Sequence, residues 1–218
     1  MTVWQFLSLG YLAVIFLGSL LLTLPFATKD GQSTSYVNAL FTSTSATCVT
    51  GLVPYDTNTH WSLFGQIVII LLIQTGGLGF MTFVSVLFGM LKRNMGLYER
   101  KAFMQSAGEW KLSGIRRLIR RIFIGTGIFE GCGAILLSIR FIPDFGAAKG
   151  IYYAVWHSVS AFCNAGFDLM GGTFGGDTFV SFTRYAADPV VSLTLCGLII
   201  IGDSVSASGG ISWTARGT

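Results

Sequence analysis

The stretch ALFTSTSATCVTG, residues 39–51, decides the fold, because it returns 115 residues later as AVWHSVSAFCNAG, residues 154–166. At this single offset six of the thirteen positions are identical: Ala39/Ala154, Ser43/Ser158, Ser45/Ser160, Ala46/Ala161, Cys48/Cys163 and Gly51/Gly166. Each copy lies between two apolar stretches. The sequence therefore contains the same unit twice, and each unit consists of a span, a segment of small residues and a second span. Such repeats place functional sites where they meet.

The composition predicts that the apolar stretches lie in a membrane. Of 218 residues, 52% are hydrophobic and 11% are charged, whereas soluble domains carry about 25% charged residues. Too few charges are present to cover a water-facing surface, and the 28 glycines suit the close helix packing of membrane proteins. We predict an all-α integral membrane protein with several passes through the cell membrane.

Four apolar stretches are predicted as spans: Phe6–Phe26, Trp61–Leu91, Ile122–Ser138 and Pro189–Gly202. The first lacks a basic start and its apolar run is too long for a signal peptide, so we expect it to be retained. The last, at ~21 Å of helix, is short of the ~30 Å hydrocarbon core. The predicted organisation is a first unit (1–91), a basic linker (92–121), a second unit with a truncated last span (122–202) and a divergent polar tail (203–218).

The positive charge lies in one loop. Nine of the fourteen Lys and Arg residues fall between Lys92 and Arg121. Because an excess of Lys and Arg marks cytoplasmic loops, segment 92–121 is predicted to be cytoplasmic and both small-residue segments to face outside. This location argues against nucleic acid as a partner. The loop is instead a docking surface for a regulatory protein or a contact with anionic membrane lipids.

The segments Val37–Leu52 and Tyr152–Leu169 do not fit the spanning pattern, because each is too short or too polar to cross a bilayer. Each also joins two spans on the side opposite the basic loop. Irregular backbone at membrane depth survives only when it is buried in protein or lines a wet cavity. We therefore predict two re-entrant pore loops, so that the fold consists of repeated span–re-entrant pore loop–span units.

The end of each pore loop is predicted to bind a monovalent cation through backbone carbonyls, which replace its water without fixed charge. Glycine adopts backbone angles closed to other residues and lets consecutive carbonyls point inward. Hydroxyls of Ser45, Thr47 or Thr50 brace the loop or add ligands. The alternative is that Gly51 and Gly166 cap two short helices. The predicted filter residues are Thr47, Cys48, Val49, Thr50, Gly51, Cys163, Asn164, Ala165 and Gly166.

These residues resemble the Trk/Ktr family of potassium transporters, and within it the Ktr-type membrane subunit, which is related to the sodium-ATPase-operon J subunit. The resemblance rests on TSATCVTGL at 44–52, SVSAFCNAGF at 158–167 and QTGGLGF at 74–80. It implies potassium uptake through a filter of four units, of which this chain holds the N-terminal two, with K+ at Gly51 and Gly166. It also implies a homodimer, a cytoplasmic nucleotide-binding regulatory subunit and a frequent need for sodium.

The chain departs from the family at its last residues. Where the family continues with glycine and apolar residues, this sequence reads DSVSASGG over 203–210. We expect the tail to be disordered or out of frame. Two hypotheses follow: a cation transporter subunit that conducts when missing units or a second copy complete it, or a truncated or frameshifted fragment that does not conduct.

Four further residues are pore or gate candidates: Gly76, Gly77, Gly79 and Glu130. The glycines lie in QTGGLGF, which lacks the Lys-Ser/Thr ending of a phosphate loop. They serve either close helix packing or a hinge that lines the pore. Glu130 lies within a span, where carboxylates are functional by default; the alternative is that it pairs with a basic group near the inner interface.

The remaining polar residues suggest no enzyme. Asp56 and Asp168 follow the two loops and either concentrate cations at the outer mouth or are solvated loop acids. His60 and His157 have no third ligand, so no metal site beyond the filter is predicted. The cysteines form no CxxC pair and are predicted to be small buried side chains: Cys48, Cys132, Cys163 and Cys196.

Overall fold

The computed structural model describes residues 3–79 and 115–207, and this part of the chain is helical, with one isolated bridge between Thr28 and Trp61 and no strand. The basic linker therefore lies outside the described residues except for its last seven positions. Those seven residues begin the long helix α7, so the second unit starts as a helix before Ile122, the boundary that hydropathy suggests.

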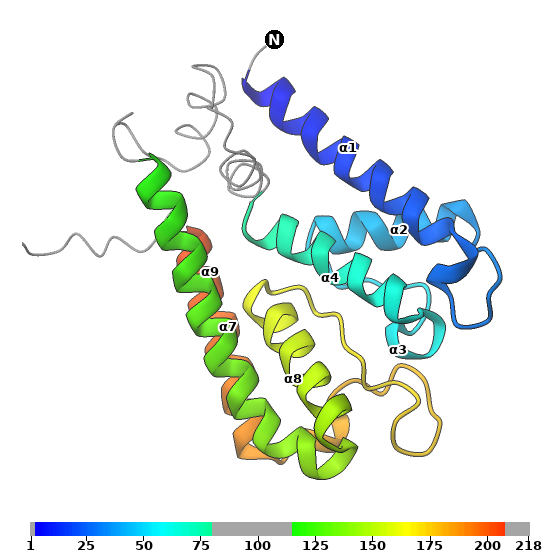
Figure 1. The fold of residues 1–218 in the computed structure, drawn as a ribbon, viewed down its shortest axis with the longest axis vertical. Helices are drawn as coiled ribbons and strands as arrows, with labels where there is room; N and C mark the ends of the chain where they lie inside the picture. The colour runs from blue at the N-terminus through cyan, green and yellow to red at the C-terminus, as the bar shows by residue number, and fades with distance from the viewer. Residues whose placement is uncertain (1–2, 80–114, 208–218) are drawn as a thin grey trace, which may run out of the picture.

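The first three main helices form one group. They are α1 (Val3–Thr23), α2 (Tyr36–Thr47) and α4 (Leu63–Gly77), with a single turn, α3 (Thr57–His60), between the last two. The short helix α2 packs against both α1 and α4 (Figure 1). Asp56 caps α3 and Ser62 caps α4, each by accepting a backbone N–H with its side chain, which supplies a partner for the first N–H groups of both helices.

The second group repeats this arrangement. It contains α7 (Ile115–Phe145), α8 (Ala147–Phe162) and α9 (Pro189–Ala207), and α8 packs against both long helices. The two groups meet where α4 contacts α8 (Figure 1). Helix α7 continues past Pro143 to Phe145, although proline removes one backbone hydrogen bond and crowds the carbonyl four residues before it.

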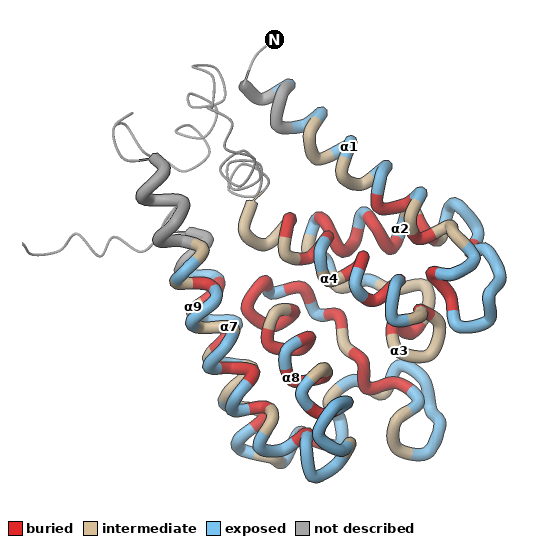
Figure 2. Tube along the Cα trace, viewed as in Figure 1, coloured by how far each residue is buried: buried red, intermediate tan, exposed pale blue. Residues whose placement is uncertain are grey.

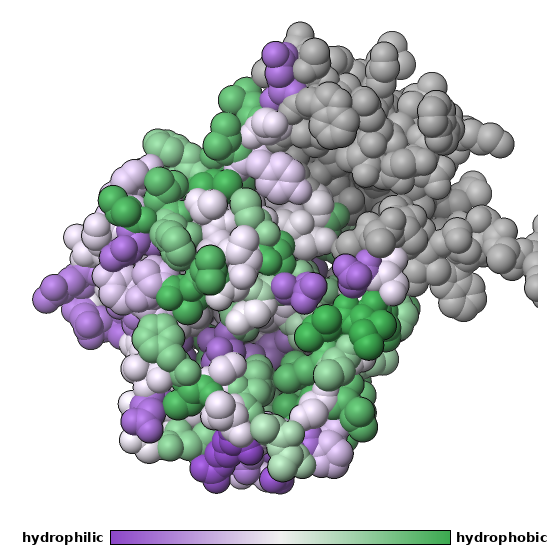
Figure 3. All heavy atoms as spheres, turned by 180° about the vertical axis from the view of Figure 1, so that it is seen from behind, coloured by the Kyte–Doolittle hydropathy of each residue, from purple (hydrophilic) through white to green (hydrophobic). Residues whose placement is uncertain are grey.

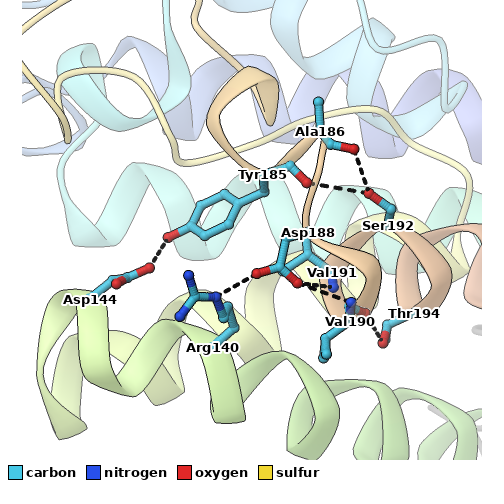
Figure 4. A network of polar contacts seen from close by, with 9 residues as sticks. All are labelled: Arg140, Asp144, Tyr185, Ala186, Asp188, Val190, Val191, Ser192 and Thr194. Carbon is cyan, nitrogen blue, oxygen red and sulfur yellow. Dashed lines mark hydrogen bonds and ion pairs between the residues drawn. The ribbon is translucent and has the colours of Figure 1, made fainter.

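A cluster of polar side chains ties the end of α7 to the start of α9 (Figure 4). Asp188 accepts the N–H groups of Val190 at 3.0 Å and Val191 at 3.2 Å, and so caps α9. Its other carboxylate oxygen accepts from the Arg140 guanidinium. The Tyr185 hydroxyl donates to Asp144 at 2.7 Å.

Helix α9 is longer than hydropathy predicts. The expected truncated span ends at Gly202, whereas the helix runs on to Ala207. Residues 203–207 are therefore helical, which corrects the expectation of a tail that is irregular from Asp203. The reason is local, because no glycine or proline lies between Gly202 and Gly209. The rest of the tail lies outside the described residues.

The described residues bury polar side chains beside an apolar core and expose large apolar side chains on the outside. Buried polar side chains gather on the two short helices and include Thr42, Ser43, Ser45, Thr47, His157, Ser158 and Ser160. Leucine, isoleucine and phenylalanine are exposed on the outer faces of α1, α7 and α9. Figure 2 shows burial concentrated along α2, α8 and the chain after α8, and Figure 3 shows apolar side chains over much of one face. This distribution suits a lipid surrounding.

One described helix, Phe123–Phe145, is long and apolar enough to cross a membrane. Three further apolar helices are shorter, over Ser8–Thr23, Leu63–Gly77 and Pro189–Ser204. The predicted span Trp61–Leu91 is described only as far as Gly79, and its helix begins at Leu63.

Candidate functional site

Helix α2 ends in a turn that places Val49 in a left-handed backbone conformation. The Val49 N–H donates to the Ala46 carbonyl at 3.3 Å, and the Thr50 N–H donates to the Ser45 carbonyl at 3.0 Å. These two bonds define a Schellman motif, whose left-handed position normally holds glycine. Val49 occupies it with a φ of 58°, at a cost of about 1–2 kcal/mol for a residue with a Cβ atom.

Helix α8 ends in the same turn. The Asn164 N–H donates to the Ala161 carbonyl at 3.0 Å, and the Ala165 N–H to the Ser160 carbonyl at 2.8 Å. Asn164 also has a φ of 58°. The capping positions are thus held by Val49 and Asn164. The alternative that the two loop glycines cap the helices is wrong, because both lie two residues further on.

Gly51 and Gly166 lie against each other. Their φ angles are 75° and 73°, a region that favours glycine. A Cβ atom on Gly51 would lie 2.8 Å from the Ala165 carbonyl oxygen and 3.4 Å from the Gly166 Cα atom. The structure therefore brings the two predicted loop ends together, although 115 residues separate them.

Side-chain hydroxyls brace both turns from within. The Ser45 and Thr50 hydroxyls lie 2.8 Å apart, and Ser160 donates to the Phe167 carbonyl at 2.6 Å. Thr47, in contrast, has a buried hydroxyl without a hydrogen-bond partner in the described residues. No described hydrogen bond ends on the carbonyl oxygens of residues 48–51 or 163–166.

Glycines hold the long helices close to the two turns. A Cβ atom on Gly76 of α4 would lie 2.0 Å from the Thr47 carbonyl oxygen, and one on Gly202 of α9 would lie 1.8 Å from that of Phe162. A Cβ atom on Gly77 would likewise lie 2.6 Å from the Cys163 sulfur. Of the two readings of QTGGLGF, close packing thus explains Gly76 and Gly77. Gly79 ends the described helix with a φ of 80° and open space around it.

Glu130 lies at the junction of the two groups. Its carboxylate accepts a hydrogen bond of 3.0 Å from the Gln74 amide. The Gln74 oxygen lies 3.5 Å from the Cys163 sulfur, so one amide links α4 with α7 and with the second turn. Among the described residues, the hydrogen-bond partner of Glu130 is the Gln74 amide. It is not a basic group, which was the alternative predicted from the sequence.

Asp56 is buried and binds a loop of the second group. One carboxylate oxygen accepts the N–H groups of Asn58 and Thr59 at 3.0 and 2.9 Å. The other accepts the N–H of Phe179 at 2.9 Å, 123 residues away. Asp56 is therefore not a solvated loop acid. Asp168 accepts the N–H of Met170 at 2.9 Å, so both carboxylates are engaged in hydrogen bonds to the backbone.

Both histidines have defined neighbours. The buried His157 accepts the Leu169 N–H at 2.9 Å through Nε2, so its Nδ1 donates to the Tyr153 carbonyl at 2.7 Å. His60 contacts the Thr34 hydroxyl at 2.9 Å. No cluster of three metal-binding side chains occurs in the described residues. Of the cysteines, only Cys163 is buried, so the expectation of buried side chains is wrong for Cys48, Cys132 and Cys196.

Two packing glycines, Gly18 and Gly133, are not among the residues predicted from the sequence, although the offset of 115 relates them. A Cβ atom on Gly18 would lie 2.5 Å from the Ser43 hydroxyl, and one on Gly133 would lie 2.5 Å from that of Ser158. Both pairs obey the same offset. Extending the comparison toward the N-terminus would have found them.

Comparison with known proteins identifies the family. The TrkH family, described as a cation transport protein, matches residues 5–204. The chain belongs to the TrkH family of cation transport proteins. It is 42% identical over 202 residues to the potassium/sodium uptake protein NtpJ of Enterococcus hirae, covering 93% of this chain and 45% of that protein.

Two other relatives in the TrkH family are Ktr system potassium uptake proteins B. Those of Bacillus subtilis and Vibrio alginolyticus are each 39% identical over 198 residues, 91% of this chain and 42% and 41% of theirs. The chain thus spans less than half the length of these relatives.

Proposed function

We propose that this chain forms part of the pore of a transporter that takes up potassium across the cell membrane. The observation that carries the proposal is the meeting of Gly51 and Gly166 at the ends of two identically built turns. Membership of the TrkH family and the names of the relatives support potassium, with sodium as a second transported cation.

The free carbonyls of the two turns support a filter. Residues 48–51 and 163–166 offer backbone oxygens that no described hydrogen bond uses. A dehydrated monovalent cation needs several such oxygens and no fixed charge. The buried hydroxyl of Thr47 is a further candidate ligand. Two turns provide half of the four-unit ring that we propose.

The orientation and partners belong to the same proposal. The basic segment 92–121 would lie in the cytoplasm and the two turns would open to the outside. A homodimeric pore and a cytoplasmic nucleotide-binding subunit that docks on this segment are proposed from the family resemblance. The segment also suits anionic lipids. The proposed protein is a transporter and not an enzyme.

The test is growth of a potassium-uptake-deficient bacterium on low potassium. Expression of this 218-residue chain should restore growth and rubidium uptake into cells, and Gly51→Asp should abolish both. Membrane insertion of each variant is checked by membrane fractionation. Inserted chain without uptake would contradict the transporter proposal and favour the non-conducting fragment, an alternative motivated by the coverage of less than half of the relatives.

A further inference from the structure

Three side-chain amides of the first group bind the second group. Asn58 lies on α3, and Gln66 and Gln74 lie on α4, so that they follow one another at intervals of eight residues. We call these three residues the amide row. An amide donates through its nitrogen and accepts through its oxygen. Each member of the row can therefore hold two partners at once.

The first two members of the amide row hold α8 and the chain that follows it. Asn58 accepts from the Tyr153 hydroxyl at 3.0 Å and donates to the Gly171 carbonyl at 2.7 Å. The Gln66 side chain accepts from the Tyr152 hydroxyl at 2.8 Å. Gln66 and Tyr153 are both buried. A shift of α8 along α4 would leave such buried groups without partners, which is costly, so these bonds fix how the two groups meet.

Gln74, the third member, reaches the second turn. It lies about 12 Å from Gln66 along α4. Its nitrogen donates to the Glu130 carboxylate at 3.0 Å, and its oxygen lies 3.5 Å from the Cys163 sulfur. Cys163 is the C-cap residue of α8 and the first of the proposed filter residues of the second turn. The amide row thus ends on the turn itself.

Glu130 fixes the orientation of the Gln74 amide. An ionised carboxylate only accepts hydrogen bonds, so the amide must turn its nitrogen toward Glu130 and its oxygen toward Cys163. Glu130 is itself held by α8, because its backbone carbonyl accepts from the buried Ser158 hydroxyl at 2.7 Å. The carboxylate therefore acts on the second turn through a single amide.

We propose that Gln74 and Glu130 are positioning residues that hold the second turn and thereby set how strictly it discriminates between monovalent cations. Discrimination depends on the size of the carbonyl cavity or on the number and field strength of its oxygens. Both change when the turn that carries the oxygens moves. Gln74 acts through Cys163, and Glu130 acts through Gln74. The effect on discrimination rests on the transporter function proposed above, whereas the hold on the turn does not.

The reactivity of the Cys163 thiol in membranes tests the hold on the turn independently of transport. Cys163 is 7% exposed and lies under α4. The chain is treated with N-ethylmaleimide, and modification of the peptide that contains Cys163 is followed by mass spectrometry. Gln74→Leu should raise the rate about fivefold, the factor that corresponds to the net loss of one hydrogen bond. The matched control is Ile69→Ala, which opens a cavity at a fully buried position of the same helix.

Variants of Glu130 separate a positioning role from general loss of stability. Glu130→Gln keeps an acceptor for the Gln74 amide and should leave the Cys163 modification rate near that of the natural chain. Glu130→Leu should raise the rate as Gln74→Leu does. The double variant Gln74→Leu/Glu130→Leu should be no faster than either, because both residues act through one contact. Additive effects in the double variant, or equal rates in Gln74→Leu and Ile69→Ala, would overturn the proposal.

Competition between rubidium and sodium tests the effect on discrimination. Gln74→Leu and Glu130→Leu should lower the ratio of rubidium to sodium uptake, and Glu130→Gln should preserve it. Faster modification of Cys163 with an unchanged ratio would refute the role in discrimination. If the inserted natural chain takes up no rubidium, the transporter function fails and the role in discrimination fails with it. The modification rates would still decide whether Gln74 and Glu130 hold the turn.

Discussion

A Cβ atom on Gly51 would lie 3.4 Å from the Cα atom of Gly166. Residues from two copies of one segment thus touch through their backbones, with no side chain between them. The Ala165 carbonyl is the nearest atom, at 2.8 Å, so any side chain on Gly51 displaces an oxygen of the proposed filter.

Gly51→Ala should abolish or greatly reduce potassium-dependent growth and rubidium uptake, because the added methyl group overlaps the Ala165 carbonyl. Gly31→Ala is the matched control. Gly31 has a similar φ of 66°, but a Cβ atom there would meet nothing within 4 Å. Both variants bear the same kind of backbone strain, so equal loss of uptake in the two would contradict a specific role of Gly51.

Val49→Asn should stabilise the chain by about 1 kcal/mol, because asparagine tolerates the left-handed conformation better than a β-branched residue does. Asn164→Val should destabilise it by a similar amount. Both turns have a φ of 58° at this position, so the two substitutions are reciprocal changes at equivalent positions. The measurement is thermal unfolding of the detergent-solubilised protein; shifts of equal sign for the two variants would be inconsistent with a shared turn.

Gly76→Ala should destabilise the chain by more than about 2 kcal/mol, since overpacking a tight contact costs 1–3 kcal/mol or more and its Cβ would approach the Thr47 carbonyl oxygen of α2. Gly125→Ala, in open space on α7, should be neutral or stabilising by about 1 kcal/mol from helix propensity. Thermal unfolding again reports the difference. If Gly76→Ala retained full stability, a hinge would explain this glycine better than close packing.

Asp56→Asn should loosen the loop that follows the second turn. Asparagine has one acceptor oxygen, so it cannot accept the N–H groups of Asn58 and Thr59 and also that of Phe179, as the two carboxylate oxygens do. A lost buried acceptor costs about 1–3 kcal/mol. Limited proteolysis should cut residues 171–182 faster in the variant. Asp177→Asn, an exposed acid in the same loop, is the control and should leave the cleavage rate unchanged. Equal rates in all three proteins would remove the anchoring role of Asp56.

Stability should fall as the pH drops from about 7.5 to 5.5, in part through His60. Burial lowers the pKa of His60 below its ordinary value of 6.5, and nearby Asp30 partly opposes this. The unfolded chain therefore takes up a proton at a higher pH than the folded chain, so stability is complete above about pH 6.5 and is lost below it. His60→Gln should weaken this dependence of the melting temperature on pH; an unchanged slope would exclude His60 as a contributor.

The sequence by itself determined the class of the protein, the duplication and the positions of the loop ends. Composition and hydropathy report how each stretch partitions between lipid and water, which is a property of the stretch alone. The offset of 115 located Gly51 and Gly166 without any knowledge of their neighbours.

Only the tertiary structure decided which residues carry the turns and what touches them. Local preference accepts Asn164 as a left-handed capping residue but disfavours the β-branched Val49, and packing around the first turn overrides that preference. The Gln74 partner of Glu130 and the Phe179 partner of Asp56 lie 56 and 123 residues away. Such pairings depend on how the two groups of helices meet, because a polar group withdrawn from water must find its partner wherever the fold places one.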